Sequence, residues 1–141
     1  MRLMVSLVLG LALVADGLVM LGDPGGWYAL VPGVPETAPF NAHFVRDIGC
    51  AYLVAGAALS WFAFDERVRP AALAGAAFLA LHALVHVADA IAGRGHPDHL
   101  MADLAGVFAP AAMALWLICR NVISREHNHV ELADQAPHRG L

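Results

Sequence analysis

Four long apolar segments alternate with short polar ones along the chain, at about residues 3–21, 48–64, 71–92 and 101–119. A helix needs roughly 17–25 apolar residues to cross a bilayer, so each segment is long enough or nearly so. Arg2 precedes the first segment as in a signal peptide, but the apolar run continues to Leu21, and a cleavage site at Ala15 would have Leu13 at the −3 position, where a small residue is required. The pattern predicts an all-α protein, an integral membrane four-helix bundle over residues 1–120.

The polar connections are short except for one. The segment between the first two spans is rich in Gly and Pro and carries Trp27 and Tyr28, a pair typical of the membrane–water interface. We therefore expect a loop that lies on the membrane surface there. Residues 121–141 are polar and are predicted to form a disordered cytoplasmic tail.

Composition and charge agree with a membrane protein and indicate its orientation. Hydrophobic residues make up 60% of the chain and charged residues 14%, with a mean hydropathy of +0.64, which excludes an ordinary soluble domain. All eight basic residues are arginines, and they form no run that would indicate nucleic-acid binding. With both termini cytoplasmic, six arginines lie inside and only Arg46 and Arg94 outside. This predicts a multi-pass protein of the bacterial inner membrane, N-in and C-in.

The ionisable residues of the spans gather in their outer halves. Helical spacing places His82, His86 and Asp89 on one face of the third span. A charged group in hydrocarbon costs on the order of 2.5–3.5 kcal/mol, so these groups should face one another or water. We expect a polar cluster that opens to the periplasm. The second span contributes the stripe His43, Asp47, Cys50 and Val54 to it, and the fourth span contributes the stripe His99, Asp103, Gly106 and Pro110.

An internal repeat relates the two halves of the chain. VADGLVMLGDP at 14–24 matches VADAIAGRGHP at 87–97, and a His-x-x-x-Asp pair follows each, at 43–47 and at 99–103. The repeat predicts two parallel helical hairpins and pairs Asp16 with Asp89. Leucines occupy the positions that match His82 and His86, so these two histidines are not required by the hairpin itself.

The cluster has the chemistry of a metal or haem site. Histidines at i and i+4 can direct ring nitrogens at one Fe, Cu or Zn ion, and carboxylates can complete its shell. We expect His82 and His86 as ligands, completed by Asp89 and His43, in a redox-linked role. The surrounding groups that would orient these ligands or balance their charge are Asp16, Arg46, Asp47, His99 and Asp103. A b-type haem held by two histidines from different helices fits the same residues.

Two other functions fit this cluster. The first is a non-catalytic accessory or structural subunit whose polar network only locks the helices together, beside a membrane partner subunit or a second copy. The second is a small transporter that uses the histidines as a proton relay. No nucleophile triad, phosphate loop or nucleotide fingerprint is present, so the sequence identifies no reaction.

The stretches GDPGGWY and PFNAHFVRDIGCAYLVAGAAL resemble the small four-helix bacterial membrane proteins grouped around DoxX. The resemblance is strongest to relatives whose second helix opens with Arg-Asp-Ile-Gly, and it covers most of residues 1–119. It implies an inner-membrane four-helix protein. In that group some members are accessory subunits of redox enzymes, and the resemblance assigns no role to the histidine pair.

Overall fold

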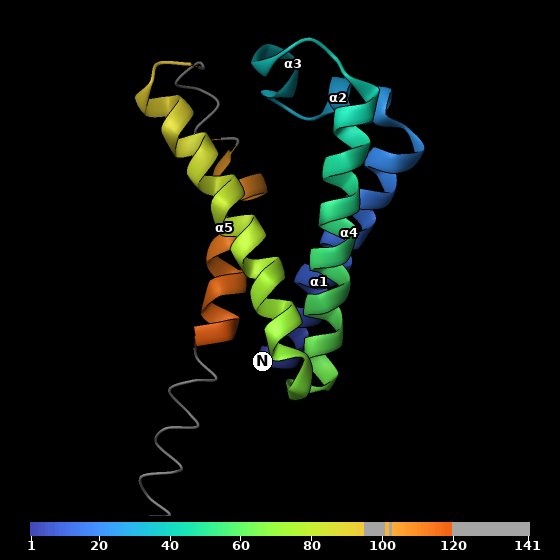
Figure 1. Cartoon of the computed structure of the whole chain (residues 1–141), viewed down its shortest axis with the longest axis vertical. Helices are drawn as coiled ribbons and strands as arrows, with labels where there is room; N and C mark the ends of the chain where they lie inside the picture. The colour runs from blue at the N-terminus through green and yellow to red at the C-terminus, as the bar shows by residue number, and fades with distance from the viewer. Residues whose placement is uncertain (95–100, 102, 120–141) are drawn as a thin grey trace, which may run out of the picture.

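The computed structural model describes residues 1–94, 101 and 103–119, and every regular element in them is helical (Figure 1). The predicted all-α class is therefore confirmed for this part of the chain. The four apolar segments form α1 (Arg2–Gly22), α4 (Ala42–Phe64), α5 (Arg69–Ile91) and the helix Leu104–Cys119, called the C-terminal helix below.

Three helical stretches are long and apolar enough to cross a membrane, namely α1, α4 and the stretch Glu66–Ile91 that includes α5. The C-terminal helix is apolar but shorter. The predicted tail at 121–141 and the predicted site residue His99 lie outside the described residues.

The predicted surface loop between the first two spans is instead largely helical, with α2 (Pro24–Leu30) and α3 (Val34–Thr37). The Asp23 carboxylate accepts a hydrogen bond from the Gly26 amide (2.9 Å) and so caps α2. Gly33 then takes a φ of 88°, a conformation that favours glycine, and separates the two helices. The Tyr28 hydroxyl donates to the Ala38 carbonyl (2.6 Å) and folds the segment back on itself.

The second span begins earlier than the hydrophobic pattern predicts, at Ala42 rather than at residue 48. The Asn41 side chain accepts hydrogen bonds from the amides of His43 and Phe44 and caps the helix. The start of α4 is thus fixed by a cap, and its first two turns carry His43, Arg46 and Asp47, which is why a hydropathy pattern misses them.

Two pairs of glycines hold α1 and α4 in backbone contact. A Cβ atom added at Gly56 would lie 2.6 Å from the Gly10 carbonyl oxygen, and one added at Gly17 would lie 2.7 Å from the Gly49 carbonyl oxygen. No real side chain fits such gaps, so these small residues set the separation of the two helices.

The third long helix packs on this pair only along part of its length. Near the end of the molecule that carries η1 (Glu66–Val68), called the η1 end, Ala72 and Ala76 of α5 are fully buried, and a Cβ atom at Gly75 would lie 3.0 Å from Ala55 Cα. Toward the opposite end, which carries α2 and α3 and is called the α2–α3 end, α5 leans away from α4 (Figure 1). The C-terminal helix lies beside α5 and contributes the fully buried Leu117 to the core.

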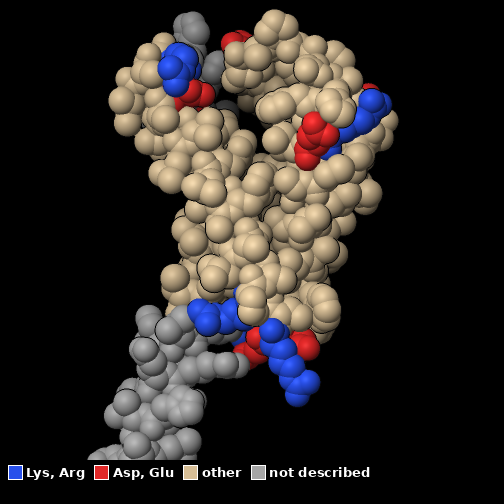
Figure 2. Space-filling view, in the orientation of Figure 1, with Lys and Arg blue, Asp and Glu red and all other residues tan. Residues whose placement is uncertain are grey.

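Charged side chains occur at both ends of the molecule, and on the face shown in Figure 2 the surface between them is uncharged. At the η1 end Arg2 pairs with Glu66. At the α2–α3 end Arg94 pairs with Asp89 at 2.8 Å. The uncharged surface carries many exposed apolar side chains, of which Val54 is 72% and Trp61 is 61% exposed.

Candidate binding cavity

The divergence of α5 from α4 leaves a cavity of about 600 Å³ in the half of the molecule toward the α2–α3 end. Figure 2 shows the molecule hollowed there, between the α2–α3 segment and the upper part of α5. Apolar side chains form most of its wall. Its polar and aromatic lining residues come from α1, α2, α3, α4, α5 and the start of the C-terminal helix, and they are Asp16, Trp27, Thr37, Tyr52, His82, His86 and Asp103.

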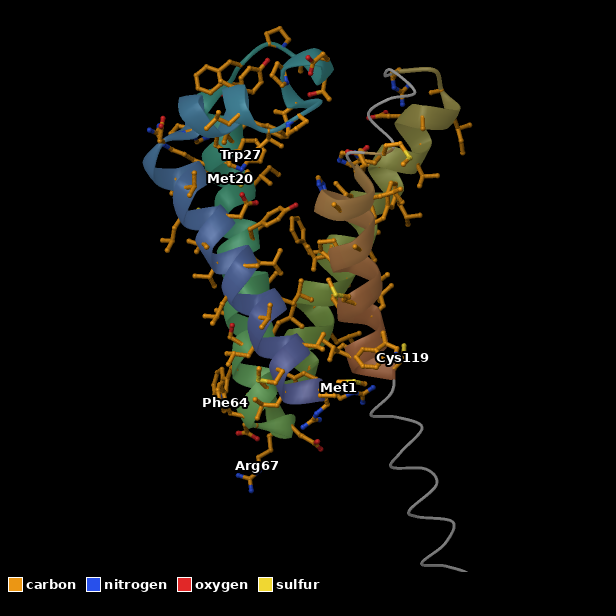
Figure 3. The ribbon with its side chains drawn as sticks, turned by 180° about the vertical axis from the view of Figure 1, so that it is seen from behind. Met1, Met20, Trp27, Phe64, Arg67 and Cys119 are labelled. Carbon is orange, nitrogen blue, oxygen red and sulfur yellow. The ribbon has the colours of Figure 1, made fainter. Side chains whose placement is uncertain are left out.

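One wall combines a carboxylate of α1 with an indole of α2. The Trp27 Nε1–H donates to Asp16 Oδ1 at 2.8 Å. Figure 3 shows Trp27 beside Met20, which lies one helical turn after Asp16 and lines the same cavity. The Trp27 side chain is half-buried and ties α2 to α1.

The opposite wall carries the histidine pair of α5. His82 and His86 share one face of the helix, with ring centroids 4.8 Å apart. His86 Nδ1 lies 2.9 Å from Asp103 Oδ2, a hydrogen bond that joins α5 to the start of the C-terminal helix. The two histidines and Asp103 are thus brought together.

The two histidines have different surroundings. His82 stacks on Phe78 (centroids 6.1 Å apart) and meets the edge of Tyr52 (6.2 Å). Within the described part of the chain His82 makes no side-chain hydrogen bond, whereas His86 has its carboxylate partner. His86 therefore connects two helices, and both histidines line the cavity.

The C-terminal helix begins beside the cavity with a π-helical turn, η2 (Leu104–Phe108). In this turn the Ala109 amide donates to the Leu104 carbonyl five residues earlier. Pro110 has no N–H to donate to Gly106, which removes one α-helical hydrogen bond from the same stretch. Gly106 lines the cavity and has open space where a side chain would stand. Such π-turns are rare and frequently occur at functional sites.

The predicted polar stripe of the second span faces away from the cavity, so the prediction that it points inward is wrong. His43 and Asp47 form an exposed pair (3.4 Å) whose side chains are 87% and 60% exposed. Cys50 and Val54 are exposed as well. The buried face of α4 contains Gly49, and residue 47 lies about 200° round the helix from it. The close contact with α1 therefore decides which side of α4 faces inward.

Arg46 and Asp89 also lie outside the cavity. The sequence predicts that Arg46 balances the charge of the cluster, but it donates through Nε to the Leu21 carbonyl (3.3 Å) and forms no ion pair with a described residue of that cluster. Asp89 pairs with Arg94 instead of completing a site with His86. Asp16 and Asp89 are equivalent in the sequence repeat, yet one faces the cavity and the other an exposed ion pair. The repeat therefore does not extend to the site.

The described residues contain no group of three or more histidine, cysteine or acidic side chains placed to hold a metal ion. The histidines that line the cavity, as far as the structure describes it, both come from α5, so among the described residues no second helix offers a histidine opposite them for a haem. The predicted ligand set of His43, His82, His86 and Asp89 is thus divided between the cavity and two exposed positions.

Trp27 and Tyr52 are the site residues that sequence reasoning did not find. Tyr52 lies on the same face of α4 as Gly49 and Gly56, and this stripe of small residues is the signal that could have marked the inward face. Comparison of the chain with protein-family models, with curated proteins and with solved structures gave no match.

Proposed function

We propose that this chain is an integral protein of the bacterial inner membrane, with N and C termini in the cytoplasm, that binds a small and largely apolar organic molecule. The binding site is the cavity between α1, α4, α5 and the start of the C-terminal helix. The size of this cavity, about 600 Å³, is the observation that carries the proposal, because ligand sites typically measure about 300–1,000 Å³.

The membrane assignment is supported by the length of the helices and by the distribution of charge. Three helical stretches are long and apolar enough to span a bilayer, and on the face shown in Figure 2 the surface between the two ends carries no charged side chain. Met1, Arg67 and Cys119 lie at one end of the molecule and Trp27 at the other (Figure 3). Arginines are favoured on the cytoplasmic side, so the end with Arg2, Arg67 and Arg69 is assigned to the cytoplasm and the cavity to the outer half of the membrane.

The walls of the cavity have the character of a ligand site. Apolar side chains such as Ile48 and Val107 cover much of it, and a few polar groups from separate helices point to the same space. This combination binds an apolar body and fixes its orientation through a small number of hydrogen bonds. We prefer an organic ligand to a bound metal because the expected metal ligands do not meet in the described residues.

The test uses Trp27 as a reporter in a Trp61→Phe/Trp116→Phe variant in lipid nanodiscs. The neutral fluorescent probe N-phenyl-1-naphthylamine should show saturable energy transfer from Trp27. Gly106→Leu adds a side chain at the cavity lining, where no atom lies within 4 Å of the new Cβ position, and should abolish the saturable signal. Gly22→Leu is the matched control, since it also enters open space and lies outside the cavity lining. Equal transfer in all three proteins would contradict the proposal.

A further inference from the structure

We infer that the cavity selects a lipophilic organic cation, such as an amine or a quaternary ammonium compound, over neutral and anionic molecules of similar size. This inference rests on the proposed function and specifies the chemical class of its ligand. It follows from the charge balance of the lining, from the aromatic groups beside the carboxylate and from the apolar remainder of the wall.

The cavity lining carries two carboxylates and no arginine among the residues that the structure describes. The arginines of the α2–α3 end are engaged elsewhere, Arg46 with a carbonyl of α1 and Arg94 with Asp89. Asp103 has His86 as its partner at 2.9 Å. The partner of Asp16 is the neutral Trp27 N–H, so the Asp16 carboxylate has no cationic side chain paired with it among the described residues.

A carboxylate without a cationic partner is costly in a surrounding of low dielectric constant. A bound cation would offset this cost, whereas an anion would add to it. Charge alone therefore favours a cationic ligand next to Asp16.

Aromatic groups in the cavity wall also favour a cationic ligand. The Trp27 indole is hydrogen-bonded to Asp16, and the Tyr52 ring lines the same cavity. Indole and phenol rings attract ammonium groups through their π-electrons, by about 0.5–2 kcal/mol according to their exposure to water. A carboxylate beside such rings is the combination that binds alkylated ammonium groups.

The remaining wall favours an organic cation over an inorganic one. Ions such as Ca²⁺ are held by about six to eight oxygen ligands, and the described residues form no group of three ligating side chains. Val31, Ile48 and Val107 instead offer apolar contacts to the hydrocarbon groups of the ligand.

The experiment is a calorimetric titration of the detergent-purified full chain with three aromatic probes of similar size. They are phenyltrimethylammonium, the uncharged N,N-dimethylaniline and benzenesulfonate. The cation should bind about tenfold more tightly than the other two, or more, because one charge interaction of about 1.4 kcal/mol corresponds to that ratio. This comparison needs no variant and is independent of any effect on folding.

Asp16→Asn then removes the charge and keeps an oxygen that can accept the Trp27 hydrogen bond. It should weaken phenyltrimethylammonium binding about tenfold and leave binding of N,N-dimethylaniline unchanged. Asp89→Asn is the matched control, since Asp89 lies outside the cavity lining, and it should have no effect on either probe.

The outcomes separate this inference from the proposed function. Equal binding of the three probes, or an unchanged cation affinity in Asp16→Asn, would overturn the selection of cations while leaving a cavity that binds organic molecules. Failure of all three to bind, with saturable N-phenyl-1-naphthylamine binding retained, would also overturn it. Loss of binding of that neutral probe as well would contradict the proposed function itself.

Discussion

At the scale of single residues, His82 and His86 differ although they occupy the same helical face. His86 is hydrogen-bonded to Asp103 of the C-terminal helix. His82 is held by ring contacts with Tyr52 and Phe78. One histidine therefore connects two helices and the other presents its ring to the cavity.

This difference predicts unequal effects on stability. His86→Leu should lower the free energy of unfolding by about 1–3 kcal/mol, because it removes an interhelical hydrogen bond and leaves the Asp103 carboxylate without its partner. His82→Leu should lower the free energy of unfolding by clearly less, since it replaces a ring that makes no hydrogen bond to a described residue. Unfolding by titration with a denaturing detergent measures both. A His82 variant at least as unstable as the His86 variant would show that the assignment of roles is wrong.

At the scale of helices, the sequence predicts the number and class of the elements better than their rotation. The apolar segments correctly indicate the three long helices, and the start of α4 is missed because Asn41 caps a beginning that carries His43, Arg46 and Asp47. The stripe with His43 and Asp47 follows helical spacing correctly but lies on the outer face. Periodicity defines which residues share a face, and only the contact between Gly49 and Gly17 decides where that face points.

The sequence predicts part of the candidate site, because polar residues within apolar spans are recognisable without knowledge of how the helices are rotated. Asp16, His82, His86 and Asp103 do line the cavity, and their position within apolar spans was sufficient to identify them. Trp27 was not found because its partner, Asp16, is reached through the fold of α2, and the composition of that segment resembles a surface loop.

The glycine contacts of α1 and α4 give a prediction at this scale. Gly56→Ala should lower the free energy of unfolding by about 1–3 kcal/mol, because the added methyl group would lie 2.6 Å from the Gly10 carbonyl oxygen and force the helices apart. Gly22→Ala adds the same group where no atom lies within 4 Å and should be nearly neutral. Detergent-induced unfolding compares the two variants. Equal stabilities would show that α1 and α4 are not in backbone contact.

At the scale of the whole molecule, tight packing at the η1 end and divergence at the α2–α3 end belong to one arrangement. Small residues such as Ala72 and Ala76 bring α5 against the first helix pair near η1. The bulkier residues Tyr52, Phe78 and His82 lie between the helices farther along. The cavity lies beside this aromatic group and under α2, so a change in residue size along α5 accounts for its position.

The proposed orientation predicts which ends of the molecule are accessible from outside the cell. In a Cys50→Ala/Cys119→Ala background, Glu36→Cys lies at the α2–α3 end and Arg67→Cys at the η1 end. A membrane-impermeant maleimide should label the first in intact spheroplasts and the second only after permeabilisation. The reverse pattern would contradict the N-in, C-in orientation.

The central claim is an open cavity that takes up a ligand, and cysteine protection at its wall tests this most directly. In the cysteine-free background, Ala105→Cys lines the cavity and Val54→Cys faces outward from the apolar surface of α4. In membrane vesicles with the α2–α3 end exposed, a water-soluble maleimide should modify residue 105 and leave residue 54 unmodified. N-phenyl-1-naphthylamine should slow the reaction at residue 105. The claim of an open cavity would be contradicted if the maleimide modified residue 105 no faster than residue 54. It would also be contradicted if N-phenyl-1-naphthylamine did not slow the modification of residue 105.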